Sequence, residues 1–163
     1  MTPTALVSAR RPPAAGRHKV LQVIWSAFLL AVVLYTPIPF LVLGAGADGG
    51  AAAPPGVRSG LYAAALGAAV ASFATRRWWT NALLAAARAA ATPTDAWARL
   101  RAGCILTWAL SEAVALIGVG LAVVAHRPAD GMPFAAVAAL LLCVHRPAAW
   151  PLRALEPGGG RSV

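Results

Sequence analysis

The stretch ILTWALSEAVALIGVGLAVV, from Ile105 to Val124, contains one ionisable side chain, Glu112, near its middle. A carboxyl group at the centre of a membrane-spanning helix costs about 2.5–3.5 kcal/mol on insertion scales and usually faces protein or water. Removal from water favours the neutral, protonated form of such a group. A neutral carboxyl group that can ionise on demand is what a reversible proton- or cation-binding site requires, so Glu112 is the first candidate for chemistry.

Two structural explanations of Glu112 compete with ion binding. The side chain could serve only as a hydrogen bond between helices, or it could form half of a buried ion pair. His145 and Arg146 lie at a depth similar to that of Glu112 when residues are counted inward from the far ends of their helices, so they are candidate partners of the carboxylate. The alternative for Arg146 is a side chain that extends to the cytoplasmic edge of the membrane.

The remaining residues do not indicate an enzyme. The sequence contains no Walker loop, HExxH, GxSxG or paired carboxylates. Its three histidines are far apart with no ligand spacing, and Cys104 and Cys143 lie in apolar segments, where small core residues are expected. We therefore expect no catalytic residues, no cofactor and no metal site. The other four acidic residues fall in expected loops or tails: Asp48, Asp95, Asp130 and Glu156.

The composition is that of an integral membrane protein. Of the 163 residues 60% are hydrophobic and only 12% are charged, whereas soluble domains carry roughly 25% charged residues. The net charge of +9 comes from arginines that flank apolar runs, not from a basic face interleaved with aromatic residues, so we expect a lipid bilayer and no nucleic acid as partner. The thirteen arginines, one lysine and many alanines favour a bacterial source.

The apolar runs predict an all-α polytopic fold, with four transmembrane helices in an antiparallel bundle. A disordered basic tail is expected over residues 1–19 and a flexible tail over 153–163, with the transmembrane domain at 20–152 between them. The expected spans are about 20–43, 59–75, 102–125 and 132–150, with a loop at 76–101 between the second and third.

Within that loop, Arg76-Arg77-Trp78-Trp79 indicates a membrane interface, because it combines charge with an aromatic belt. The alanine-rich segment from Thr80 to Ala91 either extends the second helix or lies along the membrane surface, until Pro93 stops it.

The positions of the basic residues predict the orientation. Twelve of the fourteen arginine and lysine residues lie in the N-terminal tail, the second loop and the C-terminal region from Arg146 onward, and two lie in the first and third loops. Both termini and the second loop should therefore be cytoplasmic, in a bacterial inner membrane. Ala45-Gly46-Ala47 resembles a signal-peptidase site, but the preceding apolar run is longer than a secretory hydrophobic core, so an uncleaved anchor is expected.

Small residues recur along one face of the second expected span. The spacing of four, three and four residues would let another helix backbone approach closely. The sequence therefore predicts a helix-packing face formed by Gly60, Ala64, Gly67 and Ala71.

The segment ALSEAVALIGVGLAVV, from Ala109 to Val124, resembles the second helix of the c subunit (proteolipid) of F-type and related rotary ATPases. In that helix an Ala-Leu-x-Glu-Ala core is followed by glycine and aliphatic residues. The preceding elements look similar too: a small-residue helix and a loop that begins with arginine. The resemblance covers about Ser59 to Ala125. It implies that Glu112 is a reversible ion-binding carboxylate in a c-subunit-like hairpin, here placed inside a four-helix protein.

Two functional hypotheses follow. In the first, the chain is a small inner-membrane protein that binds a proton or cation at Glu112, alone, as a homo-oligomer or with other membrane subunits. In the second, it is a membrane scaffold or accessory protein in which Glu112 only fixes helix packing and partners dock on the basic second loop.

Overall fold

The computed structural model describes residues 14–44, 53–89 and 93–147, and every element in these ranges is helical. The all-α prediction is therefore confirmed. The elements in chain order are α1 (Ala14–Tyr35), α2 (Ile38–Leu43), α3 (Pro55–Arg88), α4 (Pro93–Val124), the 3-10 helix η1 (Pro128–Gly131) and α5 (Met132–Val144).

Three helical segments are long and apolar enough to cross a membrane: Gly16–Leu43, Pro55–Ala86 and Asp95–Val124. They correspond to the first three expected spans. The fourth differs, because α5 has only 13 residues and is about 20 Å long at 1.5 Å per residue, against a hydrocarbon core of about 30 Å. Helix α5 is therefore long enough to cross only part of the hydrocarbon core.

The helix ends also differ from the expected boundaries. Helix α3 continues through Arg76 to Arg88, so the described part of the expected loop is mostly helical, since the alanine-rich segment contains no helix breaker. Helix α1 begins at Ala14, inside the expected disordered tail. Helix α5 ends at Val144 rather than near residue 150, because Pro147 disfavours helical geometry at the residue before it. The expectations for residues 1–13, 45–52 and 148–163 lie outside the described residues.

The first apolar segment is broken between α1 and α2. Pro37 and Pro39 lack the amide donors that would have bonded the carbonyl oxygens of Val33 and Tyr35, four residues earlier. The Thr36 hydroxyl donates to the Val32 carbonyl oxygen at 3.0 Å, which satisfies a neighbouring carbonyl. The helical segment therefore continues in two pieces.

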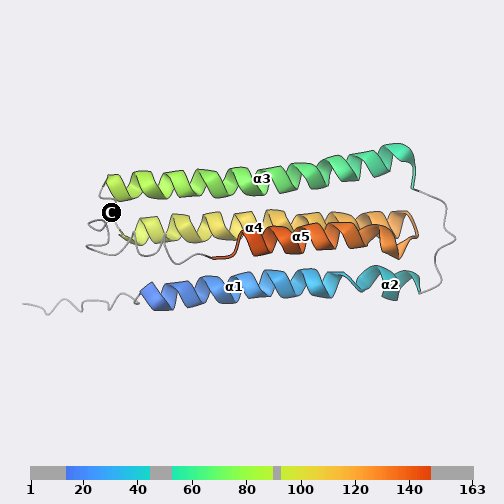
Figure 1. The fold of residues 1–163 in the computed structure, drawn as a ribbon, viewed down its shortest axis with the longest axis horizontal. Helices are drawn as coiled ribbons and strands as arrows, with labels where there is room; N and C mark the ends of the chain where they lie inside the picture. The colour runs from blue at the N-terminus through green and yellow to red at the C-terminus, as the bar shows by residue number, and fades with distance from the viewer. Residues whose placement is uncertain (1–13, 45–52, 90–92, 148–163) are drawn as a thin grey trace, which may run out of the picture.

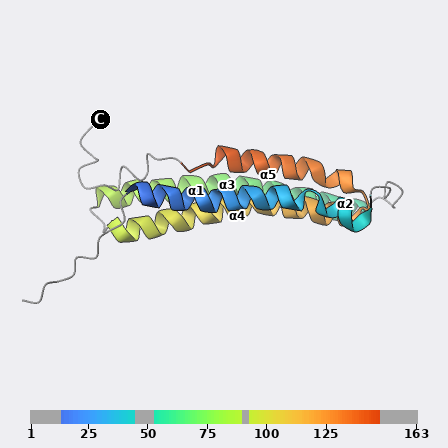
Figure 2. The same cartoon turned by 90° about the horizontal axis from the view of Figure 1, so that it is seen from below.

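Helix α4 is the central element. It contacts α1, α2, α3, α5 and η1, and 44% of its apolar segment is buried, against 11% for each of the other two long segments. In Figure 1, α3 and α1 lie on opposite sides of α4, and α3 runs in the opposite direction to both. Figure 2 shows α5 lying on one side of the layer formed by the long helices. The short helix α5 thus packs against the central helix α4.

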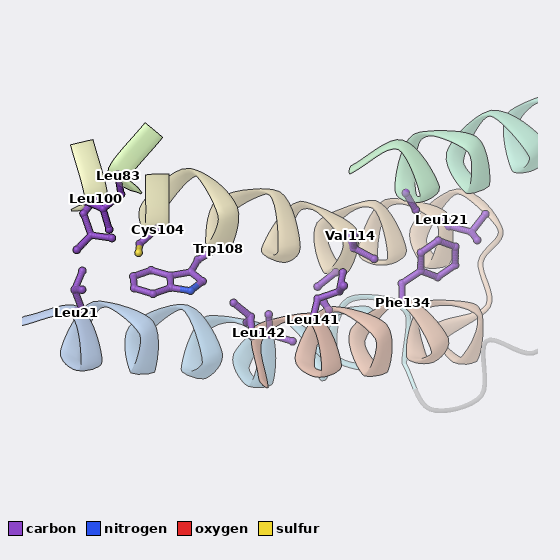
Figure 3. Close-up of a cluster of buried hydrophobic side chains, with 14 of the residues drawn as sticks. Leu21, Leu83, Leu100, Cys104, Trp108, Val114, Leu121, Phe134, Leu141 and Leu142 are labelled. Atoms are coloured by element: carbon purple, nitrogen blue, oxygen red, sulfur yellow. The ribbon is translucent and has the colours of Figure 1, made fainter. Parts of the chain in front are cut away.

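The core follows the whole length of α4 (Figure 3). Trp108 is the largest fully buried side chain, and it lies between Leu100 and Cys104 on one side and Val114 and Leu121 on the other. Helix α5 contributes Phe134, Leu141 and Leu142 to the same cluster.

The contact of α4 with η1 and α5 requires a glycine at position 118. A Cβ atom added at Gly118 would lie 2.4 Å from the Cβ atom of Phe134 and 3.0 Å from the carbonyl oxygen of Gly131. The 2.4 Å contact is too short for two carbon atoms, so Gly118 sets the distance at which α4 meets η1 and α5.

Helix α4 ends in a left-handed residue. His126 has a φ of 51°, and the amide of Arg127 donates back to the carbonyl oxygen of Ala122 at 3.0 Å. This is the pattern of a Schellman cap, in which glycine is the usual left-handed residue. The cap turns the chain from α4 into η1.

Candidate functional site

Glu112 is half-buried on α4, on the side that faces α1. The phenol of Tyr35, the last residue of α1, lies near the Glu112 carboxyl group, close enough to interact with it. The partner therefore sits directly before the break at Thr36 and Pro37. A carboxyl group and a phenol from two helices thus lie near each other where one of those helices is interrupted.

His145 and Arg146, the two candidate partners of Glu112, make no ion pair with it among the described residues. Arg146 is exposed. His145 is 4% exposed, but its ring contacts α3 rather than Glu112. The two residues after α5 thus belong to a different cluster.

That cluster is centred on the His145 ring. The Arg76 guanidinium lies 3.0 Å from Nδ1 of His145, and the Ser72 hydroxyl lies 3.1 Å from its Nε2. Arginine has no acceptor, so Nδ1 must accept from Arg76 and Nε2 carries the ring proton. Nε2–H then donates to Ser72, whose hydroxyl donates to the Ala69 carbonyl oxygen at 2.7 Å. The hydrogen bonds define a neutral histidine of one tautomer.

The same region supplies hydrogen-bond donors to the C-terminal end of α5, called its inner end below. The last carbonyl groups of a helix have no helical donor, and in a membrane each unsatisfied group costs several kcal/mol. Trp25 on α1 donates to the carbonyl oxygen of Leu142 at 2.8 Å. Trp108 on α4 donates to that of His145 at 2.9 Å.

Arg76 on α3 completes this closure by donating to the carbonyl oxygen of Val144. Its positive charge also lies at the end of a helix where the macrodipole favours a cation. The end of α5 is therefore satisfied by donors from α1, α3 and α4 together.

The predicted packing face does not pack within this chain. Gly60, Ala64 and Gly67 are exposed and Ala71 is half-buried, and a Cβ atom added at either glycine would meet nothing within 4 Å. The residues of α3 that pack against the core are their neighbours Ala65, Ala68, Ala69 and Ser72. Small residues occur on both faces, so their spacing could not show which face is covered.

Several site residues were not predicted. Tyr35, Ser72 and Trp108 carried no local signal of a role, and Arg76 was interpreted only as a marker of the membrane interface. Thr107 and Ser111 are buried and donate to the carbonyl oxygens four residues earlier. A buried hydroxyl pair one turn apart on a predicted membrane helix was the signal available for these two.

The fold and these contacts define a helical membrane protein with a carboxyl group inside the bundle and a half-length helix capped there. In the part of the chain that the structure describes, no three His, Cys, Asp or Glu side chains come together as metal ligands would. Comparison with protein-family models, with curated proteins and with solved structures finds no match.

Proposed function

We propose that this chain is a small polytopic membrane protein in which Glu112 reversibly binds a proton or another cation. The placement of the Tyr35 hydroxyl beside Glu112 is the observation that supports it. A hydroxyl can donate to an ionised carboxylate and accept from a protonated carboxyl group. The pair can therefore change protonation state by exchanging donor and acceptor, without moving either helix.

The break in α1 adds to this proposal. Interrupted membrane helices bring backbone carbonyl oxygens to positions where they can take part in ion sites. Pro37 and Pro39 remove two amide donors close to Tyr35. A cation at Glu112 would thus find further oxygen atoms on the facing helix.

The resemblance to proteolipid subunits belongs to the same proposal. Helices α3 and α4 would form the c-subunit-like hairpin, and α5 would be the fourth, partial membrane helix. The excess of basic residues supports an orientation in which both termini and the α3–α4 connection lie on the cytoplasmic side of a bacterial inner membrane.

Carbodiimide modification tests the proposal, because it labels protonated carboxyl groups in apolar surroundings. The intact protein should be labelled at neutral pH and Glu112→Gln should not. Tyr35→Phe should change the pH dependence of labelling, since it removes the hydroxyl donor. Asp130→Asn is the matched control and should label like the parent.

Two results would contradict ion binding at Glu112. One is an unlabelled parent at neutral pH with a Glu112→Gln variant of unchanged stability. The other is labelling that appears only in Arg146→Ala, which would indicate a pair between Glu112 and Arg146.

One observation supports the scaffold hypothesis: the face of α3 that carries Gly60 and Gly67 is exposed. Gly60 and Gly67 leave the helix backbone accessible to a second helix. If this face carries the function, Gly67→Leu should abolish cross-linking between copies or with a membrane partner. Gly120→Leu, at a glycine of α4 where an added Cβ atom also meets nothing within 4 Å, should not.

A further inference from the structure

A cavity of about 40 Å³ lies at the end of the bundle where α5 stops. Residues from α1, α3, α4 and the segment after α5 line it. Its polar lining includes Arg76, Trp79, Thr80, Thr107, His145 and Arg146. It is separate from Glu112, which is not among the lining residues.

The lining is positively charged. Two arginines, Arg76 and Arg146, line the cavity, and none of the described residues around it is Asp or Glu. The hydrogen bonds of Arg76 to Val144 and His145 both leave from Nη1. A guanidinium has five N–H donors in a planar fork, so this one has further donors beyond those that cap α5.

The lining also holds a buried donor without an acceptor. The indole Nε1 atom of Trp79 is buried and has no hydrogen-bond partner among the described residues. Leaving such a donor unpaired is costly, and the indole cannot easily move away, because it packs on Gly103, where an added Cβ atom would lie 2.6 Å from it. The Nε1 atom exposes almost no surface, so an acceptor in the cavity would remove that cost once the neighbouring side chains move to admit it.

We propose that this cavity binds an oxyanion, namely a phosphate group. The two guanidinium groups and the Trp79 indole supply donors and positive charge, the combination that recognises phosphate. A single water needs roughly 10–15 Å³ of such space, so the cavity admits one tetrahedral group and excludes a nucleotide.

The depth of the cavity agrees with the phosphate level of a bilayer. From Pro55 to Arg76, α3 rises about 31 Å at 1.5 Å per residue, which matches a hydrocarbon core of about 30 Å. If α3 enters the bilayer near Pro55, Arg76 lies at the opposite boundary, where lipid phosphates are found. The phosphate can come from a lipid headgroup or from free phosphate in solution.

The test uses the full chain in maltoside micelles, which contain no phosphate. Inorganic phosphate is added in one arm and phosphatidic acid in the other, and binding is measured by native mass spectrometry and by the thermal unfolding midpoint. Binding in either arm with a raised midpoint supports the site. The arm that binds identifies the source.

Variants decide whether binding occurs in this cavity. Trp79→Phe removes the unpaired donor and keeps the ring, and Arg146→Gln removes one charge. Each should weaken binding about tenfold, the loss expected for one charge-assisted hydrogen bond. Trp78→Phe and Arg77→Gln are the matched controls, since both residues are exposed neighbours that do not line the cavity.

The proposal is overturned if neither probe binds the parent, or if both cavity variants bind as the parent does. Should Trp79→Phe not fold, Arg146→Gln decides alone, because the Arg146 side chain is exposed. Failure here leaves the proposal for Glu112 unaffected, as carbodiimide labelling of Glu112 is measured independently of phosphate.

Discussion

The indole Nε1 of Trp108 donates a 2.9 Å hydrogen bond to the carbonyl oxygen of His145, which joins the middle of α4 to the inner end of α5. Trp108 is 1% exposed, so water cannot replace this donor. The bond therefore ties the position of the short helix to the central one.

Trp108→Phe should destabilise the protein by about 1–3 kcal/mol, because it leaves a buried carbonyl group without a donor. Reversible unfolding in mixed micelles with increasing dodecyl sulfate measures the change. Trp78→Phe is the control and should cost little, since Trp78 is 69% exposed. Equal losses in the two variants would show that the His145 carbonyl does not depend on Trp108.

Gly118→Ala should destabilise the protein by about 1–3 kcal/mol, because the new methyl group has no room and α5 must shift. Gly120→Ala, two residues further on, meets nothing within 4 Å. It should be neutral or stabilise by up to about 1 kcal/mol, since alanine favours the helix. A stability loss for Gly120→Ala as large as that for Gly118→Ala would place η1 and α5 differently against α4.

His126→Gly should raise the stability by about 0.5–1 kcal/mol. Glycine adopts the left-handed conformation of this position without the cost that a side chain brings, and part of the gain is lost to a more flexible unfolded chain. Ala113→Gly, in the middle of α4, is the opposite control and should cost about 1 kcal/mol. Denaturant-dependent unfolding of both variants checks the sign of the change.

The Arg58–Asp130 ion pair should contribute less than about 1 kcal/mol. Its nitrogen–oxygen distance is 3.8 Å, and the side chains are 42% and 17% exposed. A double-mutant cycle with Arg58→Gln and Asp130→Asn measures the coupling, which should fall further as salt is added. A coupling above 2 kcal/mol at high salt would contradict this assignment.

The three long helices could be predicted because their length depends on local composition alone. Unbroken apolar runs specify a helix in a bilayer whatever surrounds it. Pro93 marks a boundary for the same local reason. Glu112 could be selected because it is the one charge in its segment, which also needs no knowledge of the neighbours.

The contacts of the site could not be predicted, because they depend on the rotation of each helix about its own axis and on segments that are far apart in the chain. Counting depth placed His145 near the level of Glu112, but the helices turn the two side chains toward different neighbours. Trp25 and Leu142 are 117 residues apart in the chain, and no spacing rule connects them. Gly67 and Gly118 look alike in sequence, yet only Gly118 meets another helix.

The capped end of α5 has a consequence for how the protein is made. The donors that close it, on Trp25, Arg76 and Trp108, all belong to segments that leave the ribosome before α5 does. A helix of 13 residues is too short to be held in a bilayer as an independent span. We therefore expect it to join the protein last, by docking onto the three long helices. A chain stopped before Met132 would retain the three long segments but leave both indoles without their acceptors.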